Sequence, residues 1–167
     1  IKFTELFSGN HPRLAQAYHP MVIRFFILQT HYRSTLAFRN TALTATAQGL
    51  RRLMEAFETL QRMDLNSPET AQDNSLDQKV TDLIAELDDF MNDDFGTAKV
   101  LANLFELVPV INGIKDGHIK EDALSKTTLA IFKKQMQVDV EDILGLKKVS
   151  ENAGEQLNGV IQVLIEM

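Results

Sequence analysis

The 167-residue sequence contains no cysteine, so these residues offer no disulfide, no thiol nucleophile and no zinc site with sulfur ligands. Long apolar runs are also lacking. Stretches such as Phe25, Phe26, Ile27 and Leu28 are far shorter than the roughly 20 residues of a membrane span, so we expect no membrane segment. The first residues include no initiator methionine and show no signal or transit pattern, so we expect the chain to begin inside a longer protein.

Proline and glycine are scarce, at four and eight residues, and most apolar residues recur at spacings of three and four. This period is typical of amphipathic helices, so the sequence predicts an all-α fold. We expect one helical bundle, with helices near 20–32, 40–63, 80–93, 97–113, 124–138 and 149–164 and a flexible loop near 64–76. The last pattern has no stop signal before the final residue, so we expect the protein to continue beyond it.

Individual helices carry more specific expectations. Asn40 and Thr97 are candidate N-caps of the two long helices that they precede. In the first long helix we expect a buried seam of Leu43, Ala47, Leu50, Met54 and Phe57. The helix near 20–32 has almost no polar face and should be buried on nearly all sides. Arg24 is its only charge before Thr30, so we expect it to form a structural ion pair.

Charge is divided unevenly along the chain. Residues 1–63 hold eight basic and three acidic side chains, whereas the remainder holds nine lysines and twenty carboxylates. Every arginine lies in the first part, and the guanidinium fork suits phosphate or carboxylate partners. Two interpretations follow: an anionic partner docks on the first part, or the two parts neutralise each other within the fold.

Several kinds of site are not indicated. No glycine-rich phosphate loop is present, and His11, His19 and His31 are too far apart for a helical metal pair. The acidic residues Asp88, Asp89, Asp93 and Asp94 lack the spacing of an EF-hand. We interpret them as a solvated acidic corner at a helix C-terminus, which a cationic group or the next helix N-terminus should offset.

The candidate RNA-contacting residues follow the apolar helix. They are His31, Tyr32, Arg33, Ser34 and Arg39. A ring, a guanidinium and a hydroxyl together suit RNA backbone recognition, although cations at a helix C-terminus also favour its dipole. Arg33 has no acidic residue within four positions, so we expect it to be free for phosphate. The alternative is that Arg33 pairs with the acidic corner and holds the first segment against the bundle.

Other arginines have partners one helical turn away. Arg51 precedes Glu55 by four residues, and Glu58 precedes Arg62 by four. Such pairs attract each other on a helix surface, so Arg51 and Arg62 are weaker candidates for an external partner.

Residues 18–38 resemble the segment after the catalytic domain of bacterial cysteinyl-tRNA synthetases. The shared pattern is a proline, apolar residues, an arginine, an aromatic residue and then His31-Tyr32-Arg33-Ser34. Further similar stretches are Gly49-Leu50-Arg51-Arg52-Leu53, Met91-Asn92-Asp93-Asp94-Phe95-Gly96-Thr97, Leu104-Phe105-Glu106-Leu107 and Ile143-Leu144-Gly145-Leu146. Gly96 and Ala98 stand where the family has Asn and Pro. The similarity is strongest at residues 18–54 and 91–107.

The resemblance implies a stem-contact segment at residues 1–38 and an anticodon-binding-type helical bundle at 39–167. It implies a cytoplasmic, monomeric class I synthetase that joins cysteine to its tRNA, with ATP and Zn²⁺ bound in a catalytic domain outside these residues. This part should hold no cofactor and should be inactive alone. Two other interpretations stay open: a non-enzymatic helical protein-interaction module, and the equivalent bundle of another class I synthetase.

Overall fold

The computed structural model describes residues 2–63 and 67–149. Within these ranges the chain forms helices and turns and no strand, which confirms the predicted all-α fold. In chain order the elements are α1 (Phe3–Ser8), α2 (Pro20–Leu28), α3 (Asn40–Arg62), α4 (Asn74–Asn92), α5 (Thr97–Lys115), the 3-10 turn η1 (Glu121–Ala123), α6 (Lys126–Gln137) and the π-helical turn η2 (Val138–Ile143). The helix predicted near 149–164 lies outside the described residues.

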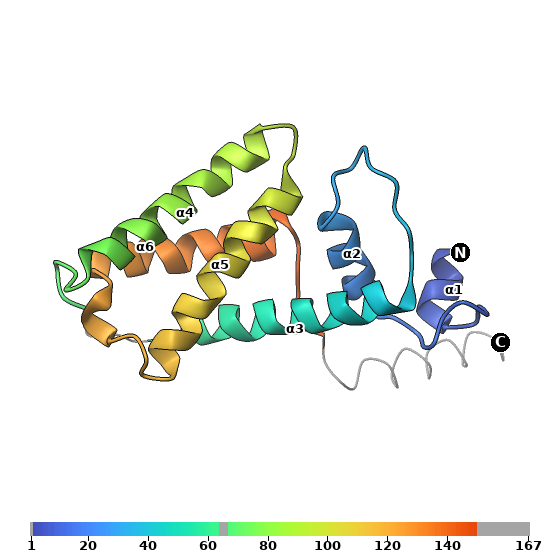
Figure 1. The fold of residues 1–167 in the computed structure, drawn as a ribbon, viewed down its shortest axis with the longest axis horizontal. Coiled ribbons are helices and arrows are strands. Elements are labelled where there is room, and N and C mark those ends of the chain that lie inside the picture. Colours follow the sequence, from blue (N-terminus) through green and yellow to red (C-terminus); the bar gives the residue numbers. More distant parts are fainter. Residues whose placement is uncertain (1, 64–66, 150–167) are drawn as a thin grey trace.

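The helices form two groups that share α3 (Figure 1). α4, α5 and α6 pack together at one end, while α2 rests on the N-terminal half of α3. The predicted seam on α3 is confirmed at Leu43, Leu50, Met54 and Phe57, which are buried, while Ala47 is half-buried. One hydrophobic core runs through both groups, so residues 1–38 and the bundle are packed as a single unit. The division at residue 38 into segments of different function stays a prediction.

α5 lies at the centre of the bundle, between α4 and α3. Nine of its residues are buried, including Leu101, Leu104, Leu107 and Ile111. By length and composition alone α5 is apolar enough to cross a membrane, but half of it is buried inside the bundle. α5 is apolar because it packs against α3 and α4 as the core helix of the bundle.

The start of α6 is held by α4. The Ser125 hydroxyl accepts a hydrogen bond from the Thr128 amide at 3.2 Å, while Asp77 of α4 accepts from the Ser125 amide at 2.7 Å. α6 therefore begins two residues after the predicted Leu124, which is buried just before it. Ile131 is 47% exposed because α6 packs through Leu129, Phe132 and Met136.

α2 is less buried than its sequence predicts. Val22, Ile23 and Phe25 are buried, but Met21, Phe26, Ile27 and Leu28 are only half-buried. The reason is its place at the edge of the fold, where α3 and α5 cover one side of it. Phe25 reaches furthest into the core, with its ring 6.2 Å from that of Phe105 on α5.

Both predicted N-caps are wrong, because the two side chains bind other segments. Asn40 is the first residue of α3, and its side chain accepts from the Ala15 amide at 2.8 Å and donates to the Arg13 carbonyl at 2.7 Å. Thr97 is the first residue of α5, and its hydroxyl donates to the Leu28 carbonyl at 2.8 Å. Each joins its helix to a segment that is distant in sequence.

Candidate nucleic-acid interface

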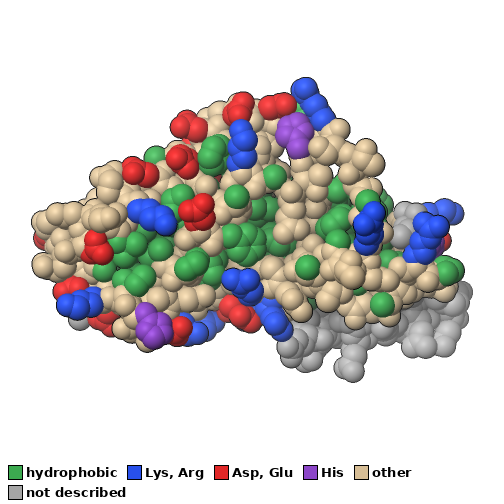
Figure 2. Space-filling model, viewed as in Figure 1, with side chains coloured by type: hydrophobic (Ala, Val, Ile, Leu, Met, Phe, Trp, Pro, Cys, Tyr) green, Lys and Arg blue, Asp and Glu red, His purple; other side chains and the backbone are tan. Residues whose placement is uncertain are grey.

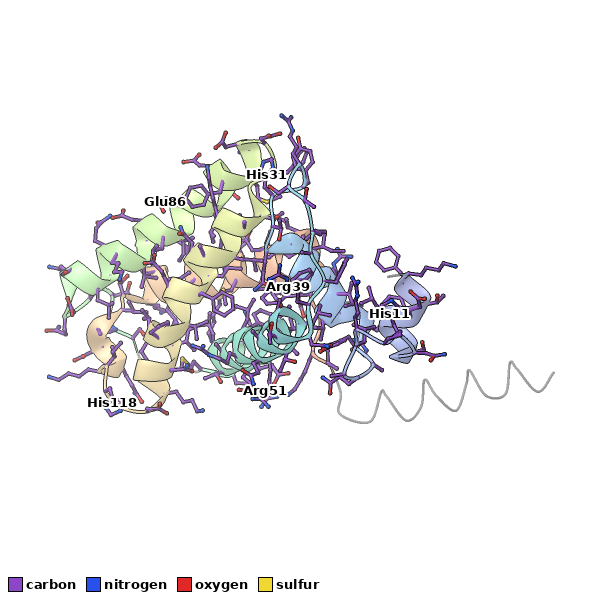
Figure 3. All side chains as sticks on the ribbon, turned by 45° about the vertical axis from the view of Figure 1, so that its right-hand side comes forward. His11, His31, Arg39, Arg51, Glu86 and His118 are labelled. Carbon is purple, nitrogen blue, oxygen red and sulfur yellow. The ribbon has the colours of Figure 1, made fainter. Side chains whose placement is uncertain are left out.

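Two segments that are far apart in sequence meet at one edge of the molecule. They are the loop 29–39, which joins α2 to α3, and the turn 93–96, which joins α4 to α5 (Figure 1). His31 marks this edge in Figure 3, next to the end of α4. The edge also carries the acidic corner, and Figure 2 shows acidic side chains along the upper rim of the molecule.

Asp94 is the point at which the two segments are joined. Its Oδ1 accepts a hydrogen bond from the Tyr32 hydroxyl at 2.7 Å and from Arg33 Nη2 at 3.4 Å. Its Oδ2 lies 3.5 Å from His31 Nε2. Arg33 Nε also donates to the Tyr32 hydroxyl at 2.8 Å, so three consecutive loop residues surround a single carboxylate.

The same three residues also stack on one another. The His31 and Tyr32 rings are stacked with centroids 4.8 Å apart, and the Arg33 guanidinium carbon lies 5.2 Å from the centre of the Tyr32 ring. All three side chains are solvent-exposed. Stacking and the shared carboxylate together fix the directions in which this exposed group points.

Hydrogen bonding at Asp94 changes the acidity of both partners. The bond donated by the Tyr32 hydroxyl, helped by the charge of Arg33, lowers the pKa of Asp94. The same bond raises the pKa of Tyr32, because the phenol donates to an anion. Asp94 is therefore ionised and Tyr32 protonated at neutral pH, which keeps the contact between the two segments intact.

The turn after α4 has an unusual backbone. Asp94 and Phe95 have φ angles of 56° and 54°, a left-handed conformation that disfavours most side chains by about 1–2 kcal/mol per residue. Gly96 follows, and a Cβ at its position would lie 2.7 Å from the Phe90 carbonyl oxygen. That close approach explains the glycine where the family pattern has Asn. Such a turn directs Phe95 outward, with 68% of the side chain exposed.

The expectation that Arg33 is unpaired is wrong. Its guanidinium contacts Asp94, as the alternative interpretation predicted, so the first segment is fastened to the acidic corner. Asp94 is 61 residues away in sequence, so the residues within four positions of Arg33 give no sign of it. The prediction that a cation offsets the acidic corner is confirmed, because Lys99 Nζ also lies 2.9 Å from Asp93 Oδ2.

Arg24 has a different partner from the one predicted. It is exposed, and its Nε donates a 2.7 Å hydrogen bond to the Leu144 carbonyl, with no carboxylate in ion-pair range among residues 2–63 and 67–149. The structural ion pair is therefore replaced by a hydrogen bond that joins α2 to the turn after η2. Because α2 lies at the edge of the fold, the guanidinium stays hydrated without an anionic partner.

The remaining candidates lie along the same loop. Ser34 is exposed, and its amide closes a turn onto the His31 carbonyl at 2.8 Å. Arg39 is exposed at the N-terminus of α3 and forms no ion pair with any described residue. In Figure 3 it lies below His31 on the same side of the ribbon. The structure thus gathers His31, Tyr32 and Arg33 tightly and leaves Ser34 and Arg39 further along the loop.

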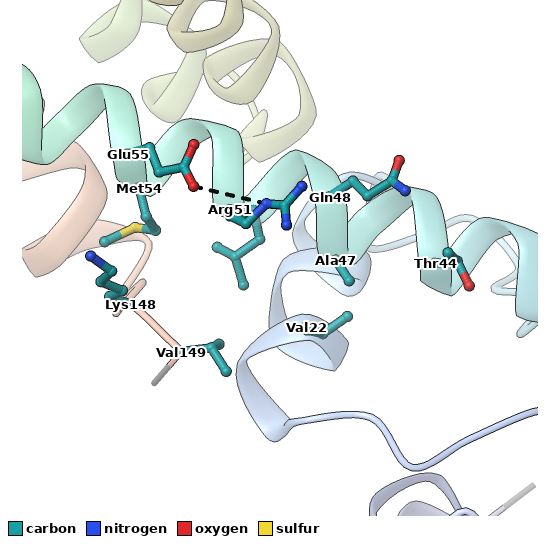
Figure 4. Close-up of a pocket in the computed structure, with 10 residues that line it drawn as sticks. Val22, Thr44, Ala47, Gln48, Arg51, Met54, Glu55, Lys148 and Val149 are labelled. Atoms are coloured by element: carbon teal, nitrogen blue, oxygen red, sulfur yellow. Dashed lines mark ion pairs between the residues drawn. The ribbon is translucent and has the colours of Figure 1, made fainter. Parts of the chain in front are cut away.

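The predicted helix-surface ion pairs are confirmed. Arg51 lies 3.9 Å from Glu55, and Arg62 lies 3.7 Å from Glu58. Arg51 and Glu55 border a cavity of about 590 Å³ beside α3, which also touches Val22, Lys148 and Val149 (Figure 4). Its walls are mainly apolar and bring together no nucleophile and base, so we assign no chemistry to it.

Residues 2–63 and 67–149 contain no cluster of three or more His, Asp or Glu side chains that could hold a metal ion. The buried acid Asp139 on η2 is isolated: Gln135 donates to its Oδ2 at 3.1 Å, while its Oδ1 has no partner within the described residues. Burial raises its pKa to about 6 despite the bond from Gln135, and the nearby Asp88 charge adds to the shift.

The comparisons with known proteins agree with this arrangement. Residues 86–148, which span the end of α4, α5, α6 and η2, match a family described as the DALR domain. Over these residues the helical bundle is therefore similar to domains of the DALR class. The acidic corner and the turn 93–96 lie inside the matched range.

Relatives along nearly the whole chain are cysteine–tRNA ligases. The ligase of Cytophaga hutchinsonii is 38% identical over 99% of this chain and 34% of its own length, and that of Bacteroides thetaiotaomicron is 41% identical over 99% and 33%. The ligase of Deinococcus radiodurans is 34% identical over 68% of this chain and 23% of its own. The chain spans about a third of the length of the first two of these relatives. The resemblance to the bacterial cysteine–tRNA ligase family is confirmed.

Proposed function

We propose that this chain is a tRNA-contacting helical domain of a cysteine–tRNA ligase, an enzyme that attaches cysteine to its tRNA with ATP in protein synthesis. The observation that carries the proposal is the similarity of 99% of the chain to ligases of that name. The DALR match over residues 86–148 supports it independently.

The tRNA contacts are assigned to the loop 29–39. Arg33 and Arg39 would bind phosphates, Ser34 would donate its hydroxyl to the backbone, and His31 and Tyr32 would offer their rings. The exposure of all five side chains supports this assignment, as does the net positive charge of residues 1–63. Asp94 holds His31, Tyr32 and Arg33 in place and partly neutralises the positive charge of Arg33. We therefore expect the contact between this loop and tRNA to be of modest strength.

The catalytic chemistry is assigned to the remainder of the ligase. ATP and Zn²⁺ would bind there, because the described residues hold no metal-ligand cluster and the sequence has no glycine-rich phosphate loop. We accordingly propose that the 167-residue chain does not activate cysteine by itself. We also propose that the parent ligase is a cytoplasmic monomer specific for the cysteine tRNA.

Titrating the chain with cysteine tRNA at rising salt concentration tests the proposal. Contacts to phosphates predict a linear fall of log affinity with log salt, with dissociation constants above about 1 μM at physiological salt because the chain carries a net charge of −6. Arg39→Ala should reduce the slope by about one, while Arg51→Ala, whose cation is paired with Glu55, should change it little. An affinity for tRNA no better than for heparin would favour a protein-interaction module instead.

A further inference from the structure

A shallow pocket opens where the loop 29–39 meets the turn 93–96, beside the Asp94 contacts. It has a volume of about 420 Å³, within the range of small-ligand sites. Its lining residues are Ile27, Leu28, Thr30, Tyr32, Phe95 and Thr97. Thr97 donates to the Leu28 carbonyl across its base, so the two segments are fixed relative to each other there.

The pocket has two exposed aromatic walls. Phe95 is 68% exposed and Tyr32 is 59% exposed, although both rings could bury apolar surface. Phe95 is held outward by a left-handed backbone, with a φ of 54°, which bulky residues seldom adopt. Strained backbone of this kind gathers at binding sites, where the surrounding structure maintains it. Phe95 therefore presents an exposed, flat ring to a ligand.

Polar groups next to these walls suit a nucleotide. Thr30 makes no side-chain hydrogen bond to any described residue, so its hydroxyl is available to the edge of a base. Arg33 uses Nε and Nη2 for Tyr32 and Asp94, and its Nη1 has no partner within the described part of the chain. Lys99 pairs with Asp93 and Arg33 pairs with Asp94, so each of the two acids in the turn 93–96 has a cation beside it.

We propose that this pocket takes one unstacked base of single-stranded RNA, stacked on the Phe95 ring, with the adjoining phosphate on Arg33 Nη1. Unpaired bases are recognised in this way, by aromatic faces together with an arginine, whereas an apolar protein side chain would leave Arg33 Nη1 without a partner. The inference rests on the proposed tRNA contact, which it refines to an unpaired nucleotide. Phe95 joins the candidate residues as a stacking group.

The chain contains no tryptophan, so Phe95→Trp places a single tryptophan in the pocket, whose emission can be excited selectively over that of tyrosine. The experiment titrates a single-stranded RNA octamer, and the same octamer as a duplex, into this variant of the whole chain. We expect saturable quenching by the single strand only. Phe3→Trp is the matched control, since Phe3 is 58% exposed on α1 and should report no quenching. In the otherwise wild-type chain, Phe95→Leu should weaken single-strand binding about tenfold, and Phe95→Tyr should retain it.

The outcomes separate this inference from the function on which it rests. If tRNA binds with the expected salt dependence but Phe95→Leu binds the octamer within twofold of wild type, the stacking site is overturned alone. If neither tRNA nor the octamer binds at low salt, the proposed function fails as well. A third outcome is that the emission of Phe95→Trp changes on adding a peptide of alternating Lys and Leu but not on adding RNA. This result would assign the pocket to a protein partner and overturn the proposal.

Discussion

The Tyr32 hydroxyl donates a 2.7 Å hydrogen bond to Asp94 across 62 positions of sequence. With Arg33 and His31 also at this carboxylate, the bond fastens the loop after α2 to the turn before α5. The contact is exposed, so its main effect is to hold the loop in position rather than to stabilise the fold.

In the full-length ligase proposed for this chain, Arg33→Ala should raise the KM for tRNA roughly tenfold if the proposed charge-assisted phosphate contact is lost. Cysteine activation should be unchanged, and Tm should fall by about 2 °C or less, since the pair with Asp94 is solvent-exposed. Steady-state aminoacylation, cysteine-dependent pyrophosphate exchange and thermal melting measure the three effects.

Comparing Arg33→Ala alone with Arg33→Ala in the Asp94→Asn background distinguishes a tRNA contact of Arg33 from a purely structural one. If Arg33 only fastens the loop, its removal lowers Tm substantially, leaves the tRNA kinetics unaltered, and adds little in the Asp94→Asn background. That pattern would contradict the assignment of Arg33 to tRNA.

Asp139→Asn should stabilise the chain above about pH 6 by roughly 3 kcal/mol. The pKa of Asp139 is raised to about 6, so the folded state binds its proton more tightly than the unfolded state does. The free energy of unfolding therefore contains a favourable contribution that is full below about pH 4 and lost as the pH rises through 6. Urea unfolding of both chains from pH 4 to 8 should show the curves separating over this interval.

Asp142→Asn is the control for that series, since Asp142 is exposed on the same π-helical turn. Its unfolding curve should follow wild type at every pH. Equal pH dependence of wild type and Asp139→Asn would rule out Asp139 as the titrating group.

Gly145→Ala should destabilise the chain by more than the conformational cost of about 1–2 kcal/mol. Gly145 has a φ of 60°, and a Cβ there would lie 2.6 Å from Arg24 Nη2. Gly117 has a φ of 74° with nothing within 4 Å of its Cβ position, so Gly117→Ala measures the backbone cost alone. In chemical denaturation, Gly145→Ala should lower the free energy of unfolding more than Gly117→Ala does, and this difference should disappear in the Arg24→Ala background. A difference that persists without the Arg24 side chain would show that the added methyl group clashes with another residue.

Gly49→Ala should stabilise the chain by about 0.5–1 kcal/mol. Gly49 lies within α3, where alanine is the better helix former. Its Cβ would lie 3.5 Å from Phe25 and 3.6 Å from Phe105, which are ordinary van der Waals contacts. A decrease in the urea midpoint would show that these rings tolerate no added methyl group.

Helix identity was predictable because it depends on local periodicity. The buried seam on α3 repeats every three or four residues. The partners in the pairs Arg51–Glu55 and Glu58–Arg62 are one helical turn apart. Each of these expectations therefore depended only on residues that are close together in the sequence. The His-Tyr-Arg-Ser and Asp-Asp-Phe motifs were recognisable for the same reason, as short continuous stretches.

The sequence by itself determined the all-α fold, the buried seam and the family resemblance, since each follows from residues close together in the chain. Only the tertiary structure decided that Asp94 would meet Arg33, that Arg24 would bind the Leu144 carbonyl, and that Asn40 and Thr97 would join other segments instead of capping their helices. These contacts join residues 25 to 120 positions apart. Such partners are set by how helices pack against one another, which the period of any one helix does not specify.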